Sequence, residues 1–270
     1  NALFTQADVA SLLEHDLRLD IRKGEDLKRE IAKIAPDVVM HLAAQPLVRY
    51  SYREPRETFE TNVNGTLNVL EAVQAASSVK ACLIITTDKV YRNVNQVEGY
   101  LETDALGGDD PYSASKAMAD ILTQSWVKSF PGAPTAIARA GNVIGGGDVC
   151  EDRLIPDVVR AFSTGSPLQI RYPNAVRPWQ HVLDCLNGYL TLVDALLAGK
   201  GSGEWNFGPG EESFVPVGTM ASLSQELWDA RTEVVIDDTP TLHEANLLAL
   251  DSTKAHKQLG WDNKLVFPAC

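Results

Sequence analysis

The chain contains 270 residues, of which 44% are hydrophobic and 22% charged, and this composition is typical of a globular protein with a substantial core. The formal net charge of −12 argues against a general nucleic-acid-binding protein, because such a protein needs a basic face for the phosphates. The four cysteines are widely separated and form no zinc or disulfide pattern. No apolar run approaches the ~18 residues of a membrane span, and no signal-peptide pattern opens the sequence. We therefore expect a cytoplasmic globular protein without nucleic-acid, membrane or metal partners.

Strand and helix patterns alternate in the first half of the chain. Residues 37–42 and 81–85 are short apolar runs that predict buried strands, and residues 135–138 predict a third. Apolar residues recur at helical spacing over 56–76 and 113–129, between these runs. Such alternation predicts an α/β protein with a parallel sheet flanked by helices.

The pattern loosens beyond Gly141, where glycines and prolines separate shorter elements. Helices are expected near residues 155–162 and 182–197. We place a smaller second lobe mainly in residues 141–270, with some of its segments completing the sheet of residues 1–140.

A phenol and an ammonium group stand four residues apart in the segment Tyr112-Ser-Ala-Ser-Lys116. On a helix this spacing places both side chains on one face. A phenol titrates near ~10, so it is a poor base at neutral pH unless a neighbouring cation lowers its pKa. A tyrosine and a lysine at this spacing more often lie on a solvated helix face. The two residues therefore indicate a site only together with other reactive groups.

Further reactive groups follow the strand predicted over residues 81–85. The segment Thr86-Thr87-Asp88-Lys89 begins directly after it, and the carboxyl ends of strands form the ligand crevice of open α/β sheets. Taken alone, Asp88 would be a capping residue and Lys89 a solvated cation. Together with Tyr112, the hydroxyl, carboxylate and amine indicate an active site.

These residues resemble the extended short-chain dehydrogenase/reductases that act on nucleotide sugars, and the resemblance covers about residues 3–261. It rests on the Tyr112–Lys116 pair, on Thr87 and on Asn62. Five longer stretches are similar to the subgroup that dehydrates CDP-glucose: His41–Arg49, Arg139–Asp148, Asp152–Pro156, Arg177–Val182 and Trp205–Pro209. Lys89 also resembles that subgroup, whereas dTDP-glucose and GDP-mannose dehydratases carry a glutamate there. The acid/base pair after Thr87 argues against a sugar 4-epimerase.

The resemblance implies a Rossmann-type, doubly wound parallel sheet and an NAD-dependent 4,6-dehydration of CDP-glucose to CDP-4-keto-6-deoxyglucose. In that reaction C4 is oxidised, water leaves across C5–C6, and hydride returns to C6. Tyr112 would take the proton of the 4-hydroxyl with help from Thr87, and Lys116 would stabilise the phenolate and hold the nicotinamide ribose. Asp88 would protonate the departing 6-hydroxyl, and Lys89 would be the base at C5.

These roles place requirements on two pKa values. Asp88 has to be protonated when the hydroxyl leaves, so we expect its pKa to be raised by burial or by carboxylate-like neighbours. Lys89 has to be neutral to act as a base, so we expect its pKa to be lowered by burial or by Lys116. The division of acid and base roles between Asp88 and Lys89 stays open.

The resemblance also assigns residues to the two ligands. Those expected at the cofactor are Asp20, Ile21, Ala43, Ala44, Gln45, Asn62, Tyr112 and Lys116. Those expected at the nucleotide sugar are Asn142, Arg153, Arg177 and His243. Arg139 is expected to be structural or to contact a neighbouring carboxylate, and His41 to be a satisfied core histidine. His243-Glu244 lacks the second histidine of a zinc-protease motif, so no metal is expected there.

The Gly-rich turn that opens this fold, where backbone amides hold the pyrophosphate, is not found among the 19 glycines. We therefore expect the printed sequence to be a piece whose βαβ beginning is missing, which makes residues 1–140 an incomplete dinucleotide-binding domain. The residue that chooses NAD or NADP would be lost with it. Such a piece is expected to bind its cofactor weakly and to be poorly stable.

Two alternatives stay open. The chain could act on another nucleotide sugar, as a dehydratase or an epimerase, or it could be a non-catalytic nucleotide-sugar-binding relative. The intact set of Thr87, Asp88, Lys89, Tyr112 and Lys116 favours an enzyme. The resemblance further implies a homodimer or homotetramer, with residues 56–76 and 113–129 as the pairing helices.

Overall fold

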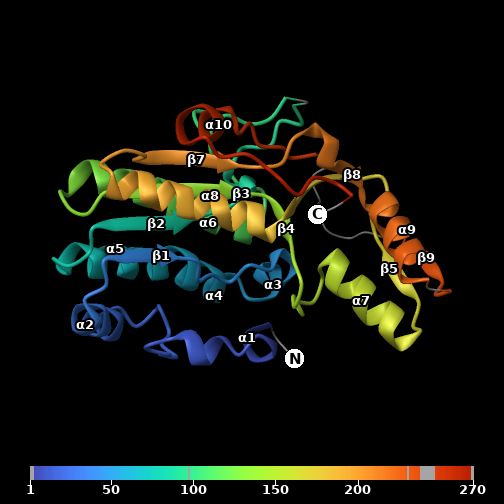
Figure 1. The fold of residues 1–270 in the computed structure, drawn as a ribbon, viewed down its shortest axis with the longest axis horizontal. Coiled ribbons are helices and arrows are strands. Elements are labelled where there is room, and N and C mark those ends of the chain that lie inside the picture. Colours follow the sequence, from blue (N-terminus) through green and yellow to red (C-terminus); the bar gives the residue numbers. More distant parts are fainter. Residues whose placement is uncertain (1–2, 97, 230, 238–246, 269–270) are drawn as a thin grey trace.

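A computed structural model describes residues 3–96, 98–229, 231–237 and 247–268. A layered α/β arrangement occupies one end of the molecule, and a smaller group of helices and short strands occupies the other (Figure 1). None of the helices in these ranges is both long and apolar enough to cross a bilayer.

A four-stranded parallel sheet forms the centre of the larger part, in the order β1-β2-β3-β7. Its strands are β1 (Val38–His41), β2 (Ala81–Ile85), β3 (Thr135–Ala140) and β7 (Gly203–Phe207). All of β3 is buried, as are the first four residues of β2, because helices cover both faces of the sheet. The predicted parallel sheet is therefore confirmed, and β7 joins it from the second half of the chain.

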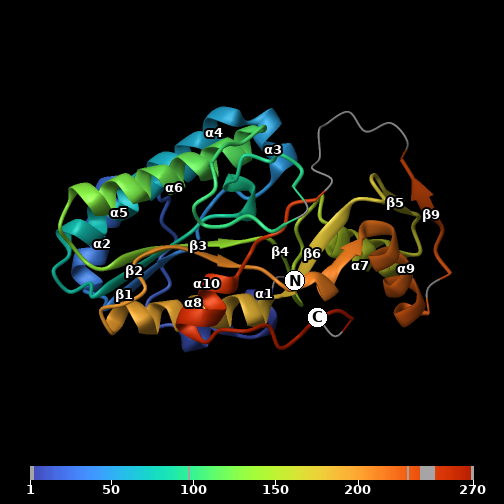
Figure 2. The same ribbon diagram turned by 90° about the horizontal axis from the view of Figure 1, so that it is seen from above.

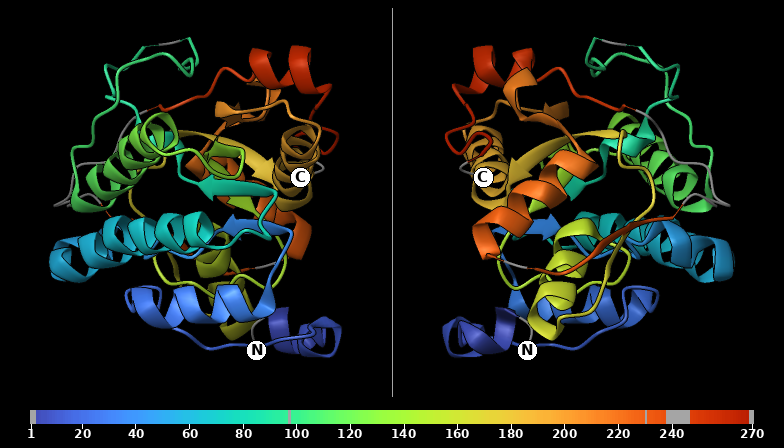
Figure 3. Two further views of the ribbon diagram at one scale, coloured as in Figure 1. Left: turned by 90° about the vertical axis from the view of Figure 1, so that its left-hand side faces the viewer. Right: turned by 90° about the vertical axis from the view of Figure 1, so that its right-hand side faces the viewer.

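Alternate residues of β2 point into two different cores. Cys82 and Ile84 pack with helices α5 (Gly65–Ala75) and α6 (Pro111–Ser129), whereas Leu83 packs with α8 (Val182–Leu197). The view from above shows α5 and α6 on one side of the sheet and α8 with α10 (Thr253–Leu259) on the other (Figure 2). The end-on views show the same layers (Figure 3). The continuous apolar sequence of β2 is therefore explained by the helices that cover both faces of the sheet.

The helix expected over residues 56–76 is divided. It consists of α4 (Pro55–Phe59), a π-helical turn η2 (Glu60–Asn64) and α5. The turn lies where Asn62 is 1% exposed and bonded to the loop after β1, and π-helical turns often occur at functional sites. Helix α6 begins two residues earlier than expected, because Pro111 occupies its first turn and Asp110 caps it by accepting from the Ser113 amide at 2.9 Å.

The smaller part contains two further sheets. In one, β4 (Asn142–Ile144), β6 (Val176–His181) and β8 (Phe214–Pro216) are neighbours, and in the other β5 (Leu168–Ile170) pairs with β9 (Val234–Ile236). Helices α7 (Leu154–Thr164) and α9 (Val217–Trp228) pack beside them. The helices predicted near 155–162 and 182–197 are thus present as α7 and α8. The division into domains at residue 140 stays a prediction.

The remaining elements are short, apart from α2, which packs against α5. They are α1 (Leu3–Gln6), η1 (Val9–Leu12), α2 (Gly24–Ile34), α3 (Val48–Arg53), η3 (Asp88–Val90) and η4 (Glu211–Ser213).

Candidate active site

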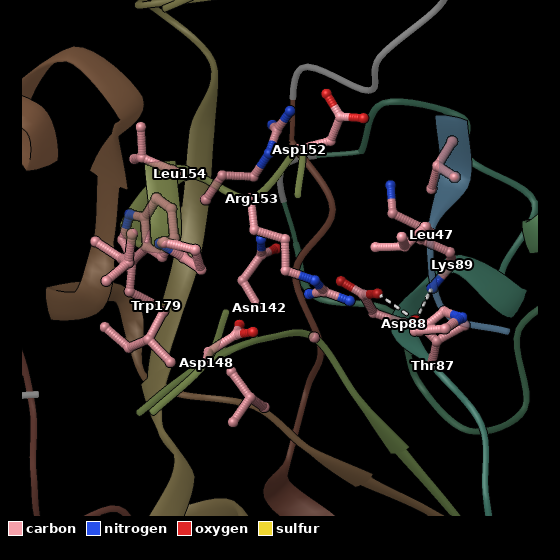
Figure 4. Close-up of a pocket in the computed structure, with 18 of the residues that line it drawn as sticks. Leu47, Thr87, Asp88, Lys89, Asn142, Asp148, Asp152, Arg153, Leu154 and Trp179 are labelled. Carbon is pink, nitrogen blue, oxygen red and sulfur yellow. Dashed lines mark hydrogen bonds between the residues drawn. The ribbon is translucent and has the colours of Figure 1, made fainter. Parts of the chain in front are cut away.

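A cavity of about 930 Å³ lies between the carboxyl ends of the parallel strands and the smaller part of the chain. Close-up, Thr87, Asp88 and Lys89 form one wall, and Asn142, Arg153, Leu154 and Trp179 lie across from them (Figure 4). The predicted residues that line it are Thr87, Asp88, Lys89, Tyr112, Asn142, Arg153 and Arg177. The structure thus brings the two predicted groups of reactive residues to one cavity.

Thr87 and Asp88 are buried at the point where the chain leaves β2. The Thr87 hydroxyl donates to Asp88 Oδ1 at 2.9 Å, and it also caps the short helix η3. Burial raises the pKa of Asp88, although the charges of Lys89 and Arg177 and the hydrogen bond from Thr87 oppose the rise. The expected raised pKa of Asp88 is therefore confirmed, whereas the lowered pKa of Lys89 stays a prediction.

Gly141 leaves the room that the Asp88 carboxylate occupies. A Cβ atom at residue 141 would lie 2.9 Å from Asp88 Oδ2, which is closer than ordinary van der Waals contact. The residue stands between strands β3 and β4, so its backbone forms part of the cavity wall. A side chain there would have to displace the carboxylate or the strand.

If Asp88 protonates a leaving hydroxyl group, as the family resemblance implies, Gly141→Ala is expected to slow that step about 10- to 100-fold, because the added methyl group would displace the carboxylate. The resemblance assigns the 4-hydroxyl proton to Tyr112 and not to Asp88, so the formation of reduced nicotinamide should be affected less. Stopped-flow absorbance and keto-sugar formation measure the two steps separately. Gly146→Ala, whose Cβ would meet nothing within 4 Å, should leave the ratio of the two rates unchanged. Equal slowing of both steps by Gly141→Ala would contradict this placement.

Tyr112 lies in the first turn of α6, and its side chain is within hydrogen-bond contact of Thr87. Burial raises the pKa of Tyr112 to about 12, against the opposing effects of the Thr87 hydrogen bond and the charge of Arg153. Lys116 is not among the main causes of this shift, and its stabilisation of the phenolate stays a prediction. The ammonium group of Lys116 instead donates to the carbonyl oxygen of Ile85 at 2.8 Å.

Lys116 is 5% exposed and does not line the cavity wall, unlike Tyr112. Burial lowers its pKa to about 8, and the charge of Asp120 one helical turn later opposes that effect. The Ile85 carbonyl uses one of the three N–H groups of the ammonium form. Among the described residues, no second acceptor bonds to this ammonium group.

Asn62 holds the loop that follows β1 through hydrogen bonds to its backbone. Its Oδ1 accepts from the Gln45 amide at 2.8 Å, and its Nδ2 donates to the Gln45 carbonyl at 3.0 Å and to Ser115 Oγ at 2.9 Å. The Gln45 side chain bonds to Leu47 and Thr58. Both amide side chains therefore support the loop that contains Ala43 and Ala44.

Asp20 and Ile21 lie apart from the cavity, beside helix α5. The Asp20 carboxylate accepts hydrogen bonds from Arg22, which lower its pKa to about 2. The Ile21 carbonyl accepts from Asn68 at 2.8 Å, and its side chain packs where a Cβ of Gly65 would be.

Asp152 is a cavity residue that the sequence did not single out as a ligand. Its Oδ1 is 3.4 Å from Arg49 and 3.3 Å from Arg171, two arginines that also line the cavity. Asp152 and Arg49 both lie in stretches that carry the family resemblance, and this was the available signal that they belong to the site. His243 lies outside the described residues.

His41 is a satisfied core histidine, as predicted. Its Nε2 lies 3.1 Å from Thr66 Oγ1, and the residue is 5% exposed. Burial, with a smaller effect of the Lys116 charge, lowers the pKa of His41 to about 4. The imidazole is therefore neutral in the folded protein at neutral pH.

This shift predicts acid sensitivity. Unfolded His41 takes up a proton near its ordinary pKa of 6.5, whereas folded His41 does so near 4, so stability should fall by about 3 kcal/mol as the pH drops through that window. Unfolding in urea at pH 7 and at pH 4.5 measures the loss. His41→Gln should remove much of it, whereas His15→Gln, at an exposed position, should not. An unchanged pH dependence in His41→Gln would contradict the assignment.

Arg139 contacts a carboxylate, as predicted, but it lies inside β3 and is completely buried. Its Nε and Nη2 donate to the two oxygens of Asp120 at 2.9 and 2.8 Å. Burial alone would lower the pKa of Arg139, but Asp120 raises it above its ordinary value, so the guanidinium stays charged.

The family assignment follows from comparison with known proteins. The profile of the family described as "GDP-mannose 4,6 dehydratase" matches residues 10–270. The chain belongs to this family. A CDP-glucose 4,6-dehydratase of Salmonella typhimurium is 43% identical, over 96% of this chain and 75% of that protein. A dTDP-glucose 4,6-dehydratase of Neisseria meningitidis serogroup B is 31% identical, over 90% of this chain and 73% of that protein.

Solved structures support the predicted Rossmann-type fold of this 4,6-dehydratase family member. DesIV, a dTDP-glucose 4,6-dehydratase of Streptomyces venezuelae solved with NAD and TYD bound, superimposes with a TM-score of 0.84. It is 26% identical and is matched over 97% of this chain and 80% of its own. A UDP-glucose 4-epimerase of Thermotoga maritima, solved with UDP-glucose, gives a TM-score of 0.83 at 25% identity over 92% and 79% of the two chains. No group of three or more metal-ligating side chains occurs in the described ranges.

Proposed function

We propose that the protein is an NAD-dependent lyase that converts CDP-glucose to CDP-4-keto-6-deoxyglucose. The observation that carries the proposal is the joint presence of Asp88, Lys89 and Tyr112 in one cavity of a chain 43% identical to a CDP-glucose 4,6-dehydratase. Two relatives named as dTDP-glucose 4,6-dehydratases, from Neisseria meningitidis serogroup B and Escherichia coli, are each 31% identical. Lys89 stands at the position where dTDP-glucose and GDP-mannose dehydratases carry a glutamate, and it therefore favours CDP-glucose as the substrate.

The residues present fit NAD at the carboxyl ends of β1 and β2. Lys116 has N–H groups free for ribose hydroxyls, the loop of Ala43 and Ala44 is braced by Asn62, and the ionised Asp20 carboxylate can accept from an adenine amino group. We assign Asp20, Ile21, Ala43 and Ala44 to direct contact, and Gln45 and Asn62 to support of the loop. Bound at these residues, NAD would supply hydride chemistry, that is, acceptance of a hydride from C4 of the sugar and its return to C6.

Tyr112 is the group that we assign to the 4-hydroxyl proton. Its phenol lies beside Thr87, so a sugar hydroxyl can be hydrogen-bonded by both side chains at once. Because burial raises the Tyr112 pKa to about 12, the phenolate needs the positive charge of Lys116 and Arg153 to form at neutral pH.

Asp88 and Lys89 are the groups that we assign to the loss of water. Burial raises the pKa of the Asp88 carboxyl, which favours the protonated form that can give its proton to the leaving 6-hydroxyl. Lys89, as the neutral amine, takes the proton from C5, which the 4-ketone has made acidic. Asn142, Arg153, Arg177 and His243 are proposed to bind the nucleotide, with the arginines at the diphosphate.

The substrate proposal is tested by incubating the complete enzyme with NAD and, separately, CDP-glucose, dTDP-glucose and GDP-mannose. We expect the 4-keto-6-deoxy product, identified by mass and by its alkaline absorbance, from CDP-glucose at the highest kcat/KM. Faster turnover of another sugar would replace the substrate assignment. Epimerised sugar without loss of water would favour an epimerase, and binding without product would favour a non-catalytic relative.

We also propose a homodimer, or a homotetramer built from it, that pairs through α4 to α6. Met118 and Ile121 of α6 are 48% and 53% exposed, and Met118 lines a shallow hollow with Phe59 and Val63. Sedimentation should show the dimer or tetramer, and Met118→Glu should dissociate it. A monomeric native protein would overturn the proposal.

A cytoplasmic location is proposed as well, since Cys82, Cys150 and Cys185 are free thiols.

A further inference from the structure

One short segment, Thr86–Tyr91, carries three of the proposed reactive residues between its two ends. Thr86 precedes Thr87, and Tyr91 follows the turn that contains Asp88 and Lys89. Both end residues are buried, with 5% and 2% of their surfaces exposed. Both residues line the cavity, and their hydroxyl groups bond to buried polar side chains.

The two ends of this segment are attached to the same buried ion pair. Thr86 Oγ1 donates to Asp120 Oδ2 at 3.0 Å, and Arg139 Nη1 donates to the Tyr91 hydroxyl at 2.8 Å. Arg139 and Asp120 are joined by two hydrogen bonds, and both are 0% exposed. The guanidinium also lies 5.0 Å from the centre of the Tyr91 ring. This charge pair thus contacts the segment before and after its reactive residues, and at the second end the Tyr91 hydroxyl also donates to Asn206 Oδ1 at 2.7 Å.

The same pair attaches the segment to the helix of Tyr112. Asp120 lies on α6 four residues after Lys116 and eight after Tyr112, so the three side chains follow one face of the helix. Arg139 belongs to β3, which pairs with β2 in parallel. The pair therefore connects the strand end that bears Thr87 and Asp88 with the helix that bears Tyr112 and Lys116.

We propose that Asp120 and Arg139 are positioning residues of the dehydratase, which hold the segment Thr86–Tyr91 in register with the Tyr112 face of α6. The inference rests on the proposed function and deepens it. A bidentate buried pair is rigid, and a partner of a buried charge cannot be exchanged for water. The proton-transfer groups are consequently kept at fixed separations, on which proton-transfer rates depend steeply.

Two variants each release one end of the segment and leave the ion pair intact. Thr86→Val removes the link at the Thr87 end, and it should lower the rate of C4 oxidation about 10- to 100-fold. Tyr91→Phe removes the link beyond Lys89, and it should slow elimination by a similar factor while C4 oxidation is largely retained. In both variants KM should change little, and Thr86→Ser should restore the rate because it keeps the hydroxyl.

Two control variants lose a hydroxyl group from a residue that does not bond to the ion pair. Thr123→Val removes a buried hydroxyl on α6 that, among the described residues, bonds to the Ala119 carbonyl of its own helix. Tyr100→Phe removes a hydroxyl from the ring stacked on Tyr91. Both should keep the wild-type kcat. Asp120→Asn is a harsher test, since it leaves the buried guanidinium without its counter-charge and can prevent folding.

A second measurement does not depend on the substrate. The amides of Val90 and Tyr91, which donate to Thr87 and Asp88 within the turn, should exchange with deuterated water faster in both variants than in the wild type or the controls. Wild-type exchange in Thr86→Val and Tyr91→Phe would overturn the proposal, and so would faster exchange with an unchanged kcat. If the wild-type enzyme does not convert CDP-glucose, the proposed function fails, and exchange alone then decides whether the pair holds the segment.

Discussion

Tyr112→Phe is expected to abolish the formation of reduced nicotinamide when the holoenzyme meets CDP-glucose. The substitution removes only the oxygen that would take the 4-hydroxyl proton, in a ring that is 9% exposed and already packed. Loss of a positioned acid/base group costs about 10²–10⁴-fold in rate. The increase in absorbance at the wavelength of reduced nicotinamide, followed in a single turnover, measures the step directly.

The control for this change is Tyr52→Phe, which removes a phenol oxygen from α3 at a residue 40% exposed and outside the cavity lining. It should oxidise CDP-glucose at the wild-type rate. The Tyr112→Phe protein should still bind the nucleotide sugar, because the groups assigned to the nucleotide lie in the other wall of the cavity. A normal reduced-nicotinamide signal in Tyr112→Phe would remove Tyr112 from the mechanism.

Local patterns were sufficient for the elements that form the sheet. The strand β2 and the helix α8 begin and end where the sequence predicted, because an apolar β-branched run and a sustained apolar stripe have few competing interpretations. The helix predicted over 56–76 was less regular. Its π-helical turn is associated with Asn62 and with the close approach of Ile21 to Gly65, neither of which changes the hydrophobic period.

The reactive residues were found from the sequence, but their electrostatics were only partly predictable. Spacing four residues apart places Tyr112 and Lys116 on one helix face, yet it does not determine which acceptor a flexible lysine reaches. The Ile85 carbonyl is that acceptor, and burial of the phenol has the larger effect on its pKa. For Asp88 the desolvation expected at a strand end was the correct cause.

Contacts between distant segments could not be predicted. Asp152 meets Arg49 across 103 residues of chain, and the room for Asp88 depends on Gly141 in another strand. Arg139 was expected to find a carboxylate, but Asp120 as its partner, and the attachment of Thr86 and Tyr91 to the pair, required the packed fold. Such contacts have no signal in local periodicity.

Lys89→Ala is expected to separate the two halves of the reaction. Tyr112 and Thr87 remain, so C4 of the sugar should still be oxidised and the reduced-nicotinamide signal should appear. Without the amine, nothing assigned in the cavity takes the C5 proton, and product formation should fall by about 10²–10⁴-fold. Incorporation of deuterium from heavy water at C5, followed by mass spectrometry, should be lost as well.

Lys80→Ala supplies the comparison, because Lys80 precedes the same strand that Lys89 follows. Its ammonium pairs with Asp37 at the exposed amino end of β2, far from the cavity lining, so its removal should leave both steps at the wild-type rate. Persistent exchange at C5 in Lys89→Ala would assign the base to another residue. Loss of C4 oxidation in the same variant would instead show that Lys89 acts before the elimination, through the charge that it places beside Asp88.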